Sequence, residues 1–204
     1  MTTRARIFVA AGVLLAACIA VVLLAAPRLR RAEADRLAGL LPLRDGMTVA
    51  EIGAGNGWLT VDVAQRVGPS GRVYSTELDA DRLTDIREAV REAGLSNVTV
   101  IEAGVEATNL PAGCCDAIVM RRVYHHLSDP SRITASIHQA LKPGGRLAII
   151  EFETDGVLGW ITRMGTDQAD LLDAVGAAGF EVVTTQEWPG WDHYIAVLRK
   201  IGDG

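Results

Sequence analysis

The sequence is poor in cysteine, and it contains no internal repeat or low-complexity segment. Of its three cysteines, Cys18 lies in an apolar run, whereas Cys114 and Cys115 are adjacent. Because this spacing suits neither a disulfide framework nor a metal site, we expect buried thiols and no bound metal. Hydrophobic residues make up 49% and charged residues 22% of the 204 residues, which disfavours disordered, collagen-like and disulfide-scaffold proteins. One globular domain is expected at this length.

Charged residues are absent from Ile7 to Ala26, and arginines flank this run on both sides. A helix rises by about 1.5 Å per residue, so the run matches a bilayer core of about 30 Å. We therefore expect residues 7–26 to form a single transmembrane helix. Two alternatives stay open: a cleaved secretory signal, and a lipoprotein signal in which residues 15–18 (LAAC) resemble a lipobox and Cys18 becomes the lipid-bearing N-terminus.

Basic residues are scarce after this segment. Five of the 20 basic residues and none of the 25 acidic residues lie in residues 1–31, which leaves residues 32–204 with a net charge of −10. An acidic domain is a poor binder of nucleic acid, so no nucleic-acid partner is expected. We expect two regions, an anchor or signal at 1–31 and one domain at 32–204. The sequence leaves the oligomeric state open.

Short β-rich runs alternate with helical runs along residues 32–204, which predicts an α/β fold. The expected architecture is a Rossmann-like, mostly parallel sheet of seven strands, with helices on both faces and an antiparallel C-terminal hairpin. The strands are predicted at 47–52, 72–77, 98–102, 116–120, 146–152, 180–185 and 194–199. The helices are predicted at 58–67, 81–93, 130–141 and 167–178.

A glycine-rich turn, Gly53-Ala54-Gly55-Asn56-Gly57, follows the first predicted strand and precedes a helix. Glycines at alternate positions let a backbone turn sharply and approach a ligand closely. A dinucleotide fingerprint requires its third glycine where Trp58 stands, which disfavours an NAD-dependent oxidoreductase. An acidic residue followed by G-x-G-x-G instead resembles motif I of the class I S-adenosylmethionine-dependent methyltransferases. The resemblance implies cofactor contacts from Glu51, Gly53, Ala54, Gly55 and Gly57.

Later segments extend this resemblance from about Leu43 to Lys200. Glu77 ends the second strand, where the family's acidic residue accepts hydrogen bonds from both ribose hydroxyls, and Leu78 follows it. Glu106 stands where the family usually has an aspartate that contacts the adenine amine. Arg121 at the end of the fourth strand completes the implied cofactor set. The family's acidic residue at the position of Glu51 helps to hold the amino group of the methionine part of the cofactor. S-Adenosylmethionine is thus the expected cofactor.

The family has no universal catalytic residue, because the enzyme mainly positions the acceptor. The segment after the fourth strand, which contains Tyr124, His125 and His126, resembles small-molecule methyltransferases with a histidine pair before a DP turn. A histidine there is a candidate proton acceptor, and Tyr124 is a candidate for the acceptor pocket. Glu151 and Glu153 at the end of the fifth strand are further candidates. No Asn/Asp-Pro-Pro-Tyr segment follows the fourth strand, which disfavours DNA-base and protein-glutamine methylation.

The expected function is methyl transfer to a small-molecule or lipid-like acceptor. The alternative is a catalytically silent S-adenosylmethionine-binding sensor or scaffold at the membrane. Because the cofactor is made in the cytosol, the anchored domain is expected to face the cytoplasm. The arginines on the two sides of residues 7–26 are balanced, so an exported or periplasmic domain stays open.

Overall fold

The computed structural model describes residues 25–154, 164–188 and 193–202. The chain divides into two units, one ending at Gly39 and the other beginning at Leu40. The described part of the first unit, from residue 25, is helical. Within the described ranges, no helix is long and apolar enough to cross a membrane. The anchor predicted at 7–26 lies almost entirely outside these ranges and stays a prediction, as does the boundary after residue 31.

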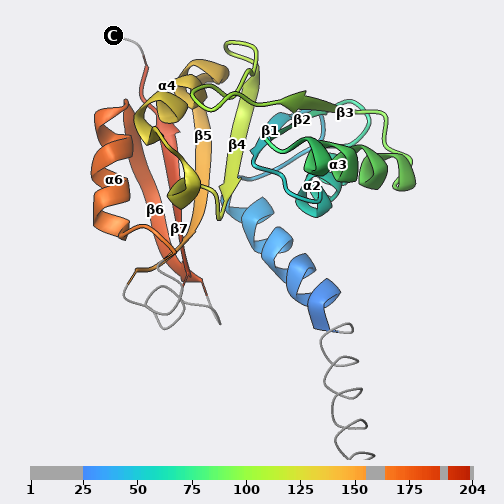
Figure 1. The fold of residues 1–204 in the computed structure, drawn as a ribbon, viewed down its shortest axis with the longest axis horizontal. Coiled ribbons are helices and arrows are strands. Elements are labelled where there is room, and N and C mark those ends of the chain that lie inside the picture. Colours follow the sequence, from blue (N-terminus) through green and yellow to red (C-terminus); the bar gives the residue numbers. More distant parts are fainter. Residues whose placement is uncertain (1–24, 155–163, 189–192, 203–204) are drawn as a thin grey trace, which may run out of the picture. The chain divides into compact units, whose positions relative to one another are not determined.

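The second unit contains a seven-stranded mixed sheet with the order β3-β2-β1-β4-β5-β7-β6 (Figure 1). The strands from β3 to β5 pair in parallel, whereas β7 is antiparallel to both of its neighbours. This confirms the predicted seven-stranded sheet and its antiparallel C-terminal strands. The strands are β1 Thr48–Ile52, β2 Arg72–Glu77, β3 Val98–Glu102, β4 Cys115–Arg121, β5 Leu141–Phe152, β6 Phe180–Trp188 and β7 His193–Lys200.

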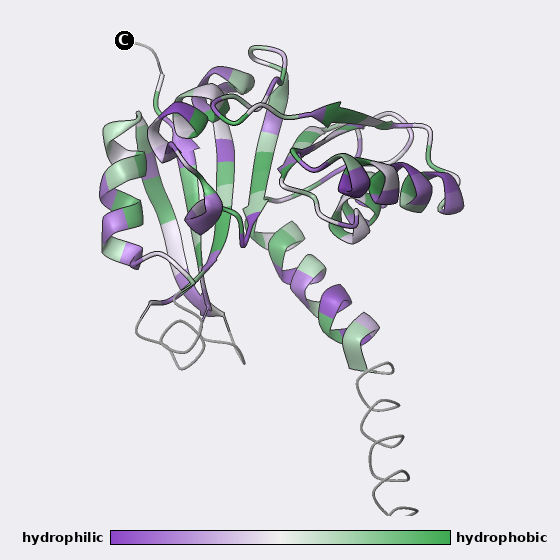
Figure 2. Ribbon diagram, in the orientation of Figure 1, coloured by the Kyte–Doolittle hydropathy of each residue, from purple (hydrophilic) through white to green (hydrophobic). Residues whose placement is uncertain are grey.

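Helices cover both faces of this sheet, and the alternation of side chains along β1 shows how. Ala50 and Ile52 join a buried cluster with Ile137 of helix α4. Glu51, between them, points to the opposite face and accepts a hydrogen bond from Thr60 of helix α2. The hydrophobic residues concentrate on the central strands (Figure 2). The helices are α2 Trp58–Val67, α3 Ala80–Glu92, η1 Tyr124–His126 (3-10), α4 Pro130–Ala140 and α6 Gln168–Ala177.

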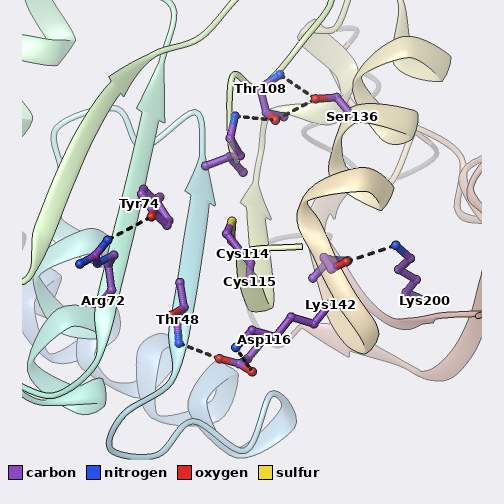
Figure 3. The surroundings of a disulfide bond; sticks show 12 residues. Thr48, Arg72, Tyr74, Thr108, Cys114, Cys115, Asp116, Ser136, Lys142 and Lys200 are labelled. Carbon is purple, nitrogen blue, oxygen red and sulfur yellow. Dashed lines mark hydrogen bonds and ion pairs between the residues drawn. A yellow bond between two sulfur atoms is a disulfide. The ribbon is translucent and has the colours of Figure 1, made fainter. Parts of the chain in front are cut away.

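Strand β5 begins five residues before its predicted start at Arg146, so it also contains residues 142–145, which the prediction left between a helix and a strand. Leu141 pairs with Cys115 of β4, and the next pair joins Arg146 to Ala117. Residues 142–145 therefore form a bulge inside the strand and not a connection before it. Lys142 in this bulge donates from Nζ to Oδ1 of Asp116 at 2.7 Å (Figure 3), which ties the bulge to β4.

The prediction of free buried thiols is wrong for two cysteines. Cys114 and Cys115 are joined by a disulfide at the start of β4 (Figure 3). Their Cα atoms are 3.8 Å apart, closer than in most disulfides. Cysteines that are adjacent in the sequence are therefore not expected to pair from their spacing alone. Cys115 is buried in the core cluster. Cys18 lies outside the described residues.

The carboxyl ends of the parallel strands meet at one edge of the sheet. The glycine turn after β1, the end of β2, the segment after β4 and the end of β5 all lie at this edge. Ligands bind at this edge in open α/β sheets. The topology therefore brings together segments that the sequence separates by up to about a hundred residues.

Candidate active site

The glycine turn has the backbone conformation that its composition predicts. Gly53, Gly55 and Gly57 have φ angles of 68°, 59° and 76°, in the left-handed region that favours glycine. A Cβ at Gly53 would lie 2.5 Å from a methyl carbon of Val123. A Cβ at Gly55 would meet nothing within 4 Å. Gly53 therefore permits close packing, whereas Gly55 borders open space where a ligand can approach the backbone.

Glu77 at the end of β2 is tied to this turn. Its Oε2 accepts a hydrogen bond from the Gly55 N–H at 2.9 Å, and its Oε1 accepts one from the Leu78 N–H at 2.8 Å. The Asp79 N–H donates to Oε1 as well, at 3.4 Å, so one of the roughly four acceptor positions of the carboxylate remains for another donor. Glu77 also lines both of the cavities described next. It is thus positioned to bind a hydroxyl group at their junction.

Two cavities open at the carboxyl edge. The smaller, about 260 Å³, has mostly apolar walls from the end of β1, the loop after β3 and the start of α4. The larger, about 730 Å³, is polar and lies along the glycine turn and the end of β4. The small cavity suits a flat apolar group, whereas the large cleft suits charged groups. Apolar residues on the wall of the small cavity include Ile52, Leu78, Val105 and Ile133.

Glu51 is a buried acid on the wall of the larger cleft, with 4% of its surface exposed. Burial raises its pKa to about 7, although the Thr60 hydroxyl and Arg121 act in the opposite direction. Thr60 also lies 2.8 Å from the Ser75 hydroxyl, so the two alcohols form a buried chain behind the carboxyl group. A nearby cation would favour the ionised form of Glu51. The sequence pattern identified Glu51 but not these two supporting residues.

Two adjacent arginines line the larger cleft at the end of β4. The Arg121 guanidinium lies 5.2 Å from the centroid of the Trp58 ring, which also lines the cleft. Arg122 has a φ of 57°, uncommon for a residue with a Cβ, and its guanidinium lies 5.1 Å from the Phe152 ring centroid. Sequence reasoning did not assign site roles to Trp58 and Arg122. Trp58 follows the glycine turn after β1, and Arg122 follows β4 directly. This position just after a strand end is the sequence feature that could have marked them as site residues.

His125 and His126 differ in position. The Nδ1 atom of His125 lies 2.7 Å from Oε1 of Glu151, and the two side chains are 6% and 0% exposed. The Nε2 atom of His125 is buried and has no hydrogen-bond partner among the described residues. His126 lines both cavities, and its ring centroid lies 4.0 Å from that of His125. The structure therefore places His126 at the cleft and the His125–Glu151 pair directly behind it.

Two predicted site residues lie elsewhere. Tyr124 is 5% exposed and belongs to the core cluster, where burial raises the pKa of its hydroxyl. Glu106 forms an exposed ion pair with Arg132 of α4. Neither Tyr124 nor Glu106 is among the described residues that line the two cavities. The neighbours of Glu106 in the same loop, Val105 and Ala107, do line the smaller one.

Comparison with known proteins shows which proteins this chain resembles. Residues 50–149 match the family described as methyltransferase domain. Over 111 residues, the chain is 33% identical to the ubiquinone/menaquinone biosynthesis C-methyltransferase UbiE of Enterobacter sp. (strain 638), covering 54% of this chain and 44% of that protein. The UbiE protein of Escherichia coli O1:K1 / APEC is 32% identical over the same shares. The chain thus spans less than half the length of these curated relatives.

Solved structures share the fold at lower sequence identity. An S-adenosylmethionine-dependent methyltransferase from Aquifex aeolicus superposes with a TM-score of 0.75 at 23% identity, covering 82% of this chain and 89% of that one. The [4+2]-cyclase SpnF superposes with a TM-score of 0.73 at 19% identity, covering 84% and 81%. At these identities the likeness concerns the fold alone. The second structure illustrates that one fold carries different reactions.

Residues 50–149 are thus similar to a methyltransferase domain, and the solved structures share the fold. The molecule to compare with the site is S-adenosylmethionine, which the sequence resemblance implies. The described residues fit this molecule. The open space at Gly55 admits a ligand, the small apolar cavity suits the adenine, and Glu77 has an acceptor position left for a ribose hydroxyl. Glu51 in the polar cleft suits the ammonium group of the methionine part. Glu106 stays a predicted contact.

Proposed function

We propose that this methyltransferase domain transfers a methyl group from S-adenosylmethionine to a small-molecule acceptor, and that His126 takes the proton which the acceptor loses. The observation that carries this proposal is the position of His126 on both cavities, backed by the buried His125–Glu151 pair. His126 therefore borders both the cofactor site and the cleft from which an acceptor arrives. A histidine changes its protonation near neutral pH, as a proton acceptor requires.

The cofactor, when bound, supplies an electrophilic methyl group on a sulfonium. Glu77 and the glycine turn would hold the adenosine part, Glu51 would hold the ammonium group of the methionine part, and Arg121 would hold its carboxylate. These residues fix the orientation of the transferable group, and orientation supplies most of the rate in a direct displacement. Val123 and Leu127 line the smaller cavity beside His126 and add to its apolar wall.

The His125–Glu151 pair positions His126. A carboxylate accepts but does not donate, so the hydrogen of a neutral His125 ring lies on Nδ1, facing Glu151. The Glu151 carboxylate also accepts the N–H groups of His125 and Phe152, at 3.2 and 2.8 Å. These contacts fix the His125 ring against which the His126 ring packs at a tilt of 44°. General-base groups in such positions contribute about 10²- to 10⁴-fold to a rate.

The relatives support an acceptor that loses a proton. UbiE of Enterobacter is a C-methyltransferase, and methylation at carbon or at a hydroxyl oxygen requires the loss of a proton from the acceptor. The histidine at the cleft supplies the group for that loss. Both an acidic carbon next to a hydroxyl or carbonyl and a phenolic hydroxyl fit this requirement.

The first test is isothermal titration of the full chain with S-adenosylmethionine and S-adenosylhomocysteine. We expect micromolar binding, corresponding to about −8 kcal/mol, in the wild type. We expect loss of binding in Glu77→Ala and unchanged binding in Glu102→Ala, whose exposed side chain ends the neighbouring strand. A folded chain that gives no heat and no thermal shift with either ligand would contradict the proposal.

The second test asks whether bound cofactor is used. The full chain is incubated with S-adenosylmethionine labelled in its methyl group and with membrane and small-molecule extracts. Transfer of label into an extracted compound supports the enzyme. Cofactor binding without transfer into any extract favours the alternative, a silent sensor or scaffold, and the superposition with a cyclase shows that this fold does not guarantee methyl transfer.

The predicted anchor at residues 7–26 supports a domain held at the cytoplasmic face of a membrane, where the cofactor is available. An acceptor dissolved in the membrane would suit such an enzyme. Fractionation of cells that express the full chain, followed by protease treatment of intact and opened membranes, tests both points. Recovery of residues 32–204 free of the membrane or outside the cytoplasm would contradict them.

A further inference from the structure

A buried hydroxyl group on helix α2 contacts the acid of the larger cleft. The side chain of Thr60 is 0% exposed, and its Oγ1 donates to Oε2 of Glu51 at 2.5 Å. We infer that Thr60 is a positioning residue for the cofactor, because its hydroxyl favours the ionised form of the Glu51 carboxyl group that meets the ammonium group, and that Ser75 supports Thr60. This inference rests on the proposed function, because it concerns the cofactor that the proposed reaction consumes.

The strand register places Ser75 beside Glu51. Glu51 of β1 is aligned with Ser75 of β2 on one side and with Val119 of β4 on the other. Aligned side chains of neighbouring parallel strands point to the same face of a sheet, which here is the face that α2 covers. Val119 is apolar, so Ser75 is the polar neighbour of Glu51 along this row of the sheet. Its Oγ lies 2.8 Å from Oγ1 of Thr60, and the Ser75 side chain is 0% exposed.

A hydroxyl group at position 60 interrupts an apolar stripe. The buried residues of α2 recur at helical spacing, and all of them except Thr60 are apolar: Leu59, Val63, Ala64 and Val67. A buried hydroxyl group costs free energy unless it forms hydrogen bonds, and valine would fill the same space without that cost. The contact with Glu51 therefore gives a physical reason for a threonine at this position.

The directions of the two hydrogen bonds follow from the charge on Glu51. An ionised carboxylate accepts and cannot donate, so the Thr60 hydrogen points to Glu51 and the Ser75 hydroxyl donates to Thr60. Hydrogen bonds that run in one direction along a buried chain strengthen one another. The chain therefore stabilises negative charge on the carboxyl group at the cleft.

The charges around Glu51 agree with this role. Burial raises the pKa of Glu51, and the Thr60 hydroxyl opposes burial more strongly than Arg121 at the end of β4. Glu77 at the end of β2 acts in the same direction as burial. The other charged or titratable residues on the described wall of this cleft are Asp79, Arg82, Arg122 and His126.

The test follows the ionisation of Glu51 in the full chain. Proteins with isotope-labelled glutamate carboxyl groups are titrated by NMR without ligand, and the Glu51 signal is the one that Glu51→Gln lacks. We expect Thr60→Val to raise the titration midpoint by at least about one pH unit, because the ionised acid loses a hydrogen bond. Calorimetry with S-adenosylhomocysteine should then show binding about fivefold weaker than in the wild type at pH 7 and only about twofold weaker at pH 8.

The matched control is Thr134→Val, which removes a buried hydroxyl group of α4 that donates to the Pro130 carbonyl at 2.7 Å. It should leave the titration of Glu51 unchanged. Thr60→Ser keeps a hydroxyl group and should restore most of the wild-type titration. Ser75→Ala should raise the midpoint by a smaller amount, because Ser75 acts through Thr60. Thermal melting checks that each variant is folded.

Two results would overturn the inference: an unchanged titration of Glu51 in both Thr60→Val and Ser75→Ala, or an equal shift in Thr134→Val. The titration without ligand distinguishes this failure from failure of the proposed function. Wild-type protein that gives no heat with S-adenosylhomocysteine contradicts the cofactor site itself. Wild-type binding that Thr60→Val does not weaken at pH 7 contradicts only the role of Thr60.

Discussion

The Nδ1 atom of His125 lies 2.7 Å from Oε1 of Glu151, although the two residues are 26 positions apart in the sequence. Parallel pairing of β4 with β5 produces this contact, because Arg121 is aligned with Ile150 and both strands end at the same edge. The carboxyl group is fully buried and accepts hydrogen bonds from three N–H groups. Such a carboxylate holds an imidazole in one orientation.

Substitution of this carboxylate should slow methyl transfer and leave the binding of cofactor intact. For Glu151→Gln we expect kcat to fall by about 10- to 100-fold, because His126 loses its fixed neighbour. The Kd for S-adenosylmethionine should change by less than about threefold, a small free-energy difference. We also expect a changed pH profile of kcat, which a merely structural role would not produce. The measurement is initial-rate kinetics with the identified acceptor.

Glu102→Gln is the control for Glu151→Gln, because it removes an exposed carboxylate from the same edge of the sheet. Glu151→Asp should recover part of kcat if the acid acts through the His125 ring. An equal loss in both glutamine variants, or a loss confined to cofactor affinity, would exclude the positioning role.

Gly55 and Gly94 form a matched pair for testing the cofactor site. Both have left-handed φ angles, 59° and 65°, and a Cβ at either position would meet no atom within 4 Å. Replacement by alanine should therefore cost both variants a similar backbone strain of about 1 kcal/mol. Only Gly55 lines the cleft, so Gly55→Ala alone should weaken binding of S-adenosylhomocysteine, by at least about tenfold. Titration calorimetry combined with thermal melting measures both effects, and equal affinities would place the ligand elsewhere.

Cofactor binding should depend on pH through Glu51, whose pKa is raised to about 7 by burial. Below pH 7 this acid carries a proton, and it must release that proton to face the cationic ammonium group. We expect affinity to rise with pH by up to about tenfold per unit and to level off above pH 7. Glu51→Gln should bind more weakly at pH 8 and lack this dependence. Calorimetry in two buffers of different ionisation enthalpy counts the released proton, and a count of zero at pH 6 would contradict the mechanism.

The same shift predicts how Glu51 affects folding. The folded state holds the proton up to about pH 7, whereas an unfolded glutamate releases it near its ordinary value of about 4.5. The free energy of unfolding should therefore fall as pH rises between these two values and then stay constant. Glu51→Gln removes this contribution. Comparison of Tm between pH 4.5 and 7 for the two proteins tests the direction of the effect.

Asp116 should stabilise the fold at neutral pH. Burial raises its pKa, but hydrogen bonds from Lys142 and from the Thr48 N–H outweigh burial, and the pKa lies below the ordinary 3.8. Its contribution is present above pH 3.8 and is lost as pH falls through the lowered value. Asp116→Asn should reduce Tm at pH 7 by about 2–6 °C, with a smaller difference below pH 4. Asp85→Asn, which removes an exposed ion pair with Arg82, should change Tm little and serves as the control.

The sequence by itself determined the order of the elements and predicted the residues on the cofactor side of the site. The strands at Arg72–Glu77 and Val98–Glu102 and the helix at Trp58–Val67 lie at their predicted residues, because periodicity, glycine and proline act over a few neighbouring positions. Glu51, Gly55 and Glu77 were recognisable for the same reason. Each stands at the end of a strand, and the ends of parallel strands meet at one edge of the sheet.

Only the tertiary structure decided which distant groups meet. The insertion of β7 between β5 and β6, the bulge at residues 142–145 and the contact between His125 and Glu151 all depend on pairing across long stretches of chain. The left-handed turn of Arg122 onto Phe152 likewise depends on the Ile150 carbonyl of another strand. Local patterns fix which residues stand at a strand end, whereas packing fixes where their side chains point. The proposed acceptor side of this site depends on that packing.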